Sequence, residues 1–152
     1  MGQFWWENAI VYQVNLKKRQ KSTSDGFGNI KGLVESLDNI KELGVNTILL
    51  NSIFISQKND NGYGISNYYA IDEKLGDLLD VEKLFKEAKK RELKIIFNLV
   101  LNHTSNQHPW FKEALKGPQN IYRDYYLWHD DSNGGYPNNW KAYIGGSVWE
   151  KE

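Results

Sequence analysis

The chain has 152 residues, 40% of them hydrophobic, and its 19 basic side chains balance 19 acidic ones. Zero net charge argues against a dedicated nucleic-acid binder, which needs a basic surface to displace counterions from phosphates. No stretch approaches the roughly 20 consecutive apolar residues of a membrane helix, and the first residues lack the features of a secretory signal. We therefore expect a globular, cytoplasmic protein that binds neither nucleic acid nor a membrane. Cysteine is absent, which excludes disulfides and a thiol nucleophile.

Three short apolar runs alternate with two amphipathic segments along the first hundred residues. The runs predict buried strands, because they are rich in β-branched side chains, and they span residues 9–14, 45–50 and 93–101. Apolar residues at spacings of three and four predict a helix over 30–43, which ends at Gly44. A second helix is predicted to begin at Asp80, with its apolar stripe at Val81, Leu84, Phe85 and Ala88. Residues 51–79 have few periodic apolar positions and are expected to form a loop.

The alternation of strands and helices predicts an α/β fold, in which helices cover a parallel sheet. From about residue 102 the composition changes to aromatic residues, asparagine, glycine and all three prolines. Only a short helical patch near 110–115 is expected there.

One loop has the spacing of a calcium site without its charges. Oxygen-bearing side chains recur at Thr23, Asp25 and Asn29, but Lys21 stands where the first ligand would be. Calcium takes six to eight oxygen ligands, usually several of them carboxylates, and this loop offers one. We therefore expect no metal and no other cofactor. A sharper hypothesis, based on charge matching, places the Lys21 ammonium group where a calcium ion would lie.

His103 stands at the carboxyl end of the third predicted strand. A lone histidine is most often structural, but α/β proteins gather ligand-binding groups at this end of parallel strands, so both interpretations stay open. The three histidines lack the spacing of zinc ligands. Aromatic residues are concentrated in the loops between Tyr63 and Trp140. Their faces suit sugar rings, although most are expected to pack beneath the loops.

Eight segments follow one another along the chain: FWWENAIVYQ at 4–13, DGFG at 25–28, LDNIKELGV at 37–45, NGYGISNY at 61–68, NHTS at 102–105, HPWF at 108–111, YRDYYLW at 122–128 and PNNW at 137–140. Together they resemble the N-terminal part of an α-glucosidase of the α-amylase glycoside hydrolase family. The group of oligo-1,6-glucosidases, trehalose-6-phosphate hydrolases and sucrose isomerases is the most similar.

The resemblance implies the first three β/α units of a (β/α)8 TIM barrel over residues 1–101, followed over 102–152 by the start of an inserted loop domain, domain B. The barrel is expected to be incomplete. The implied reaction is retaining hydrolysis of α-glucosidic bonds in short oligosaccharides, with two carboxylic acids as nucleophile and acid. Both acids lie in the family on later strands, so this chain is expected to hold no catalytic residue and to be inactive alone. Two sugar contacts carry over by position: Tyr63, on which the sugar stacks, and His103, which hydrogen-bonds it.

Two positions depart from the family pattern. The resemblance implies an aspartate after the stacking tyrosine and another on the third strand, where this sequence has Gly64 and Asn98. The alternative to a truncated enzyme is therefore a non-catalytic descendant that binds a sugar or a partner protein, with affinity for α-glucosides weak or lost. The open sheet of such a chain is expected to leave unpaired strand edges, which invite self-association.

Overall fold

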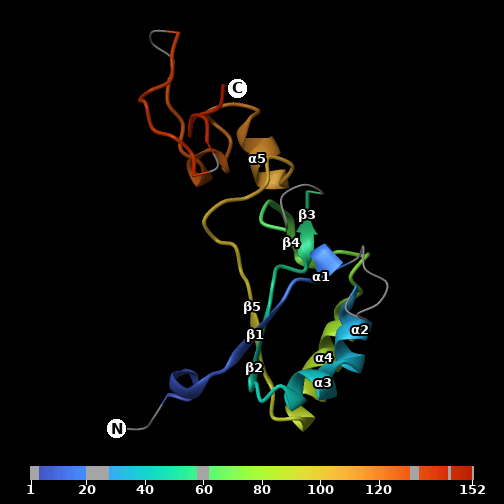
Figure 1. Cartoon of the computed structure of the whole chain (residues 1–152). Coiled ribbons are helices and arrows are strands. Elements are labelled where there is room, and N and C mark those ends of the chain that lie inside the picture. The colour runs from blue at the N-terminus through green and yellow to red at the C-terminus, as the bar shows by residue number, and fades with distance from the viewer. Residues whose placement is uncertain (1–3, 20–27, 58–61, 131–133, 144, 152) are drawn as a thin grey trace. The chain divides into compact units, whose positions relative to one another are not determined.

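The computed structural model describes residues 4–19, 28–57, 62–130, 134–143 and 145–151 (Figure 1). They form two compact units, 1–108 and 109–152. The first is built on a parallel sheet of β1 (Val11–Val14), β2 (Thr47–Leu50) and β5 (Lys94–Phe97), in the order β1-β2-β5. The predicted parallel sheet is confirmed, with strands shorter than their apolar runs.

Three helices lie side by side on one side of this sheet (Figure 1): α2 (Ile30–Glu35), α3 (Leu37–Glu42) and α4 (Leu78–Lys90). The single helix predicted over 30–43 is wrong, because it is interrupted at Ser36, where ψ is 2°. The Ser36 hydroxyl donates to the carbonyl of Gly32 at 2.9 Å. Such a side-chain bond competes with regular helical geometry and favours a turn. Gly44 follows α3 at φ +79°, as expected for a glycine that ends a helix.

Helix α4 begins three residues earlier than predicted. Its N-cap is Asp77, whose carboxylate accepts a hydrogen bond from the backbone N–H of Asp80 at 2.9 Å. The carboxylate of Asp80 in turn accepts from the N–H of Asp77 at 3.3 Å, which completes a reciprocal capping box. Of the predicted stripe, Phe85 is 46% exposed, and its ring leans on Phe97 at a centroid distance of 5.4 Å.

The expectation of a loop over 51–79 is wrong. An antiparallel pair, β3 (Phe54–Ser56) and β4 (Ile65–Ile71), forms there, with irregular register between Phe54 and Ser56. The three-residue β3 is too short to show an alternating pattern, and Ser66 and Asn67 interrupt the apolar pattern of β4. Two short elements lie at the start of the chain: η1 (Trp5–Asn8) and α1 (Leu16–Arg19).

The core lies between the sheet and the three helices. Its fully buried side chains include Ile30, Leu33, Leu37, Ile48, Leu50, Leu75 and Leu84. Burial of such a side chain stabilises the fold by about 1.5–3 kcal/mol.

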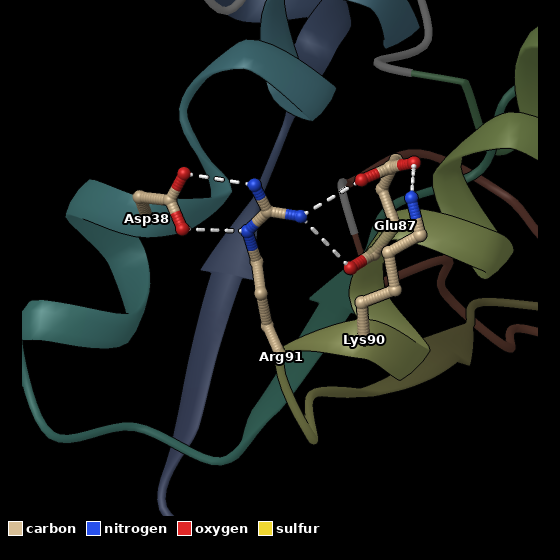
Figure 2. Close-up of polar contacts among 4 residues, drawn as sticks. All are labelled: Asp38, Glu87, Lys90 and Arg91. Atoms are coloured by element: carbon tan, nitrogen blue, oxygen red, sulfur yellow. Dashed lines mark hydrogen bonds and ion pairs between the residues drawn. The ribbon is translucent and has the colours of Figure 1, made fainter.

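An ion-pair network on the outside of the helices joins α3 to α4 (Figure 2). The guanidinium group of Arg91 donates to both carboxylate oxygens of Asp38, at 2.6 and 2.8 Å, and to the Glu87 carboxylate at 3.0 Å. These bonds hold the pKa of Asp38 below its ordinary value and raise the pKa of Arg91. Hydrogen bonds from Lys90 and then from Arg91 lower the pKa of Glu87.

The second unit contains α5 (Pro109–Ala114) and η2 (Arg123–Tyr125), and the predicted helical patch is confirmed. The guanidinium group of Arg123 lies 3.4 Å from the ring centre of Trp128 and donates to the carbonyl of Ala114 at 3.0 Å. Aromatic rings pack around these contacts, as expected for most of the loop aromatics: Trp110, Phe111, Tyr122, Tyr125 and Tyr126. Across the described residues of both units, every helix is too short or too polar to cross a membrane.

Candidate functional site

The three parallel strands all end in a carboxamide. Asn15 directly follows β1, Asn51 follows β2 and Asn98 follows β5. The backbone ladder continues to these positions, since the N–H of Asn51 donates to Val14 and that of Asn98 donates to Leu50, each at 3.0 Å. Ligands of open α/β sheets bind beside this end of the strands. Here the three strand ends offer neutral groups that both donate and accept hydrogen bonds.

The side chain of Asn51 is held in place by its neighbour on β1. Its carboxamide oxygen accepts a hydrogen bond from Nε2 of Gln13 at 2.8 Å, and the residue is 7% exposed. This contact crosses between two adjacent strands and fixes one of the three terminal amides. Asn98 lies at the end of β5, which is an edge strand of the sheet. This is the position at which the resemblance implies an aspartate.

Tyr63 and Gly64 lie immediately before β4. The Tyr63 side chain is 41% exposed, and the carbonyl of Gly64 accepts a hydrogen bond from the N–H of Gln57 at 3.3 Å. Gly62 before them is buried at φ +91°. A Cβ at that position would lie 3.3 Å from both the carbonyl oxygen of Ser52 and Cδ of Lys17. The turn that presents Tyr63 therefore requires glycine at 62.

Lys17, in the short helix α1 after β1, binds the hairpin formed by β3 and β4. Its ammonium group donates to the carbonyl of Phe54 at 2.9 Å and to the hydroxyl of Ser56 at 2.6 Å, and lies 3.5 Å from the Asp72 carboxylate. The Lys17 side chain is only 16% exposed. The Lys17 ammonium group thus contacts oxygens of Phe54 and Ser56 in β3 and of Asp72, directly after β4. These contacts hold the two strands beside Gly62.

His103 lies in the irregular segment after β5 and is exposed. Nδ2 of Asn102 lies 3.2 Å from Nδ1 of the His103 ring. The backbone carbonyl of His103 lies 2.9 Å from the Tyr68 hydroxyl.

The structure ties the Tyr63 and His103 segments together, although 40 residues separate them in sequence. The N–H of Ser105 donates to the carbonyl of Ile65 at 2.9 Å. Nε2 of Gln57 donates to the Ser105 hydroxyl at 2.8 Å and contacts Asn106. Tyr63 is two residues before Ile65, and His103 is two residues before Ser105. The bond between Ile65 and Ser105 therefore lies close to both predicted sugar contacts.

Sequence reasoning missed the residues that make these ties. Gln57 and Lys17 are polar residues in segments with no periodic pattern, and no sequence signal marks them. Tyr68 is one of many aromatic residues in this part of the sequence, and nothing in the sequence sets it apart from the others.

His108 closes the first unit and is 4% exposed. Burial lowers its pKa, and its ring lies 5.6 Å from that of Tyr68. This buried imidazole packs against a tyrosine in the first unit.

The hypothesis of a lysine replacing calcium falls on Lys21, Thr23 and Asp25, which lie outside the described residues. Asn29, the last member of that loop, is described. Its side-chain oxygen accepts from the N–H of Gly32 at 2.8 Å and caps α2. Within the described parts of the chain, three or more histidine or acidic residues do not gather into a possible metal site.

Comparison with known proteins identifies the lineage. A family model for the alpha-amylase catalytic domain matches residues 13–152. An oligo-1,6-glucosidase of Parageobacillus thermoglucosidasius is 43% identical over 150 residues, which is 99% of this chain and 27% of the relative. A trehalose-6-phosphate hydrolase of Bacillus subtilis is 44% identical over 147 residues, or 96% of this chain and 26% of the relative.

Solved structures that resemble this chain come from the same group of enzymes. A trehalose-6-phosphate hydrolase of Bacillus licheniformis matches with a TM-score of 0.87 at 50% identity, over 97% of this chain and 27% of that one. A mutant isomaltulose synthase of Erwinia rhapontici, solved with its natural substrate sucrose, matches with a TM-score of 0.89 at 41% identity, over 99% of this chain and 27% of that one. This chain thus spans about a quarter of the length of these relatives, and its open sheet of three parallel strands corresponds to the first units of a TIM barrel. The chain belongs to the family of alpha-amylase catalytic domains.

Proposed function

We propose that these 152 residues are a portion of an α-glucosidase and supply part of its sugar-binding site. Tyr63 offers a half-exposed aromatic face on which a glucose ring stacks, and His103 offers a hydrogen bond to its hydroxyls. The observation that carries the proposal is the bond between Ser105 and Ile65, which joins the segments bearing these two side chains. The names of the relatives, oligo-1,6-glucosidase and trehalose-6-phosphate hydrolase, support an α-glucoside as the ligand.

The chain contributes binding and not the acids of catalysis. Retaining hydrolysis requires two carboxyl groups about 5–5.5 Å apart across the scissile bond. The residues that directly follow the three parallel strands are Asn15, Asn51 and Asn98, and a carboxamide does not act as nucleophile or acid there. We infer that the acids are supplied by later strands of a complete barrel. In this scheme residues 1–101 are the barrel portion and 102–152 begin domain B.

A second candidate is a non-catalytic, sugar-binding descendant of the family. Gly64 and Asn98 favour it, because both stand where the resemblance implies aspartates. A neutral residue at each position removes a charge-assisted hydrogen bond, which contributes about 1.5–3 kcal/mol.

The test is a titration of the isotope-labelled 152-residue chain with methyl α-glucoside, observed by NMR. We expect shifts at Tyr63 and His103. Replacement of Tyr63 by alanine should weaken binding about tenfold, because an aromatic contact contributes roughly 0.5–1.5 kcal/mol beyond its buried area and 1.4 kcal/mol is tenfold. Tyr69→Ala, at a residue that is 85% exposed, is the matched control and should leave binding unchanged. Equal effects of the two variants, or no shifts at either contact, would contradict the proposal.

Turnover of p-nitrophenyl α-glucoside separates the two candidates. The isolated chain should release no nitrophenol under either candidate. If a longer chain that continues into the later strands does release it, the enzyme is favoured, and if that chain binds methyl α-glucoside without turnover, the descendant is favoured. Turnover by the 152-residue chain itself would overturn the assignment of the acids to later strands.

A further inference from the structure

The hydroxyl group of Tyr68 lies between two backbone carbonyls of the segment that carries His103. It is 2.7 Å from the oxygen of Val100 and 2.9 Å from the oxygen of His103. Tyr68 belongs to β4, which follows the Tyr63 turn directly. One side chain of the hairpin thus reaches across to the strand-end segment at two points, three residues apart.

The Tyr68 ring packs against two other rings. Phe54 of the neighbouring strand β3 lies 6.4 Å from it, and His108 lies 5.6 Å from it, each measured between ring centroids. A phenol has two side-chain torsions, so a packed ring places its oxygen with little freedom. The donor that meets the two carbonyls is therefore fixed by the hairpin.

The segment that receives this donor is also held two residues beyond His103, where the N–H of Ser105 donates to the carbonyl of Ile65. It leaves β5 after Phe97 and contains no regular structure up to Pro109. Leu99 is 52% exposed and Leu101 is 78% exposed, whereas Val100 between them is 8% exposed. The segment is thus anchored at Val100, and Tyr68 bonds both this anchor and the residue whose imidazole is exposed.

We propose that Tyr68 is a positioning residue that, through its hydroxyl bonds to the Val100 and His103 carbonyls, fixes the backbone that carries the His103 imidazole relative to the Tyr63 turn. The inference rests on the proposed function for the role of His103, but the positioning itself does not depend on a ligand. The hydroxyl has one proton for two acceptors, so it donates to one carbonyl at a time and keeps both within reach.

The test compares Tyr68→Phe with Tyr69→Phe in the 152-residue chain. Both changes remove one oxygen atom from adjacent residues of the same strand, but Tyr69 is 85% exposed. The chain has three histidines, so their ring C–H signals are readily resolved by NMR. With Tyr68→Phe we expect the ring signals of His103 and the amide signals of 101–104 to shift and broaden, while the signals of His129, in the other unit, stay in place. Tyr69→Phe should move none of them.

The second readout is the dissociation constant for methyl α-glucoside. Tyr68→Phe should raise it at least threefold, and Tyr69→Phe should not change it. If methyl α-glucoside binds neither the variants nor the unmodified chain, the proposed function fails, whereas the His103 signals still decide the positioning role. Unmoved His103 signals in a folded Tyr68→Phe chain would overturn that role.

A measurement on the unmodified chain covers the case in which Tyr68→Phe does not fold. A hydroxyl proton held between two carbonyls exchanges slowly with water and gives a visible signal, with nuclear Overhauser effects to residues 100–104. We expect this signal from Tyr68 and none from the Tyr69 hydroxyl. A Tyr68 hydroxyl that exchanges as fast as that of Tyr69 would overturn the proposal.

Discussion

Replacement of Lys17 by methionine should destabilise the first unit by about 1.5–3 kcal/mol. Methionine keeps an unbranched apolar chain against Gly62 but removes the ammonium group. The change leaves the carbonyl of Phe54 and the hydroxyl of Ser56 without their donor, at bonds that now measure 2.9 and 2.6 Å. Hydrogen bonds to a charged group contribute about 1.5–3 kcal/mol, and the Lys17 side chain, at 16% exposed, is poorly screened by water.

The matched control is Lys31→Met. Lys31 also faces a carboxylate, that of Asp80 at 3.8 Å, but its side chain is 69% exposed. The Asp80 side chain is only 11% exposed, but the exposed lysine end of the pair is solvated, and a surface ion pair contributes about 0–1 kcal/mol. The two variants lose the same charge and gain the same side chain, so the difference between them isolates the contacts of Lys17.

Urea unfolding followed by far-ultraviolet circular dichroism measures both variants. Lys17→Met should move the midpoint to lower urea with an unchanged slope, because the surface exposed on unfolding is nearly the same. A fall of 1.4 kcal/mol is a tenfold change in the unfolding equilibrium. If Lys17→Met loses no more stability than Lys31→Met, the ammonium group does not hold the hairpin.

Four further predictions concern backbone, pH and assembly. Gly62→Ala should cost more stability than Gly44→Ala in thermal unfolding, because both have positive φ but only Gly62 has neighbours within 3.4 Å; equal losses would show that the crowding is relieved. The pKa of Asp38 is lowered by Arg91, so its stabilising contribution is present above the ordinary carboxyl pKa of about 4 and is lost as pH falls through the lowered value. Arg91→Met should therefore flatten the dependence of unfolding free energy on acid pH, and an unchanged slope would contradict this. Burial lowers the pKa of His108, so the unfolded chain takes up a proton first, and stability should decline as pH falls through about 6.5; His108→Gln should abolish that part of the curve. The open sheet should drive self-association, which size-exclusion chromatography over a concentration series would detect as a shift to larger species, and a monomer at every concentration would refute it.

The sequence was sufficient for the parallel sheet and its helices, because their signals are local and strong. Runs such as Ile48 to Leu50 read as buried strands, and the stripe through Leu84 and Ala88 reads as one face of a helix. Errors arose where a single polar side chain decides the backbone. Ser36 divides a continuous apolar stripe into two helices through a bond to Gly32, and Asp77 caps α4 although Asp80 is closer to the stripe.

The candidate site could be predicted only in part. The family resemblance pointed to Tyr63 and His103 one by one, and their roles as sugar contacts stay predictions. The contacts that join their segments lie between residues about 40 positions apart, such as Ile65 and Ser105, and no pattern within either segment encodes that distance. The hairpin that carries Gln57 was itself missed, because β3 has three residues.

The three carboxamides at the strand ends have a consequence for how this edge meets a ligand. Each amide both donates and accepts, as every sugar hydroxyl does, so a polyol can be matched there without a counter-charge. Contacts between dipoles are hardly weakened by dissolved ions, whereas contacts between full charges are screened over about 10 Å in 0.1 M salt. Contacts that a polyol makes with amides at this edge should therefore change little as ionic strength rises.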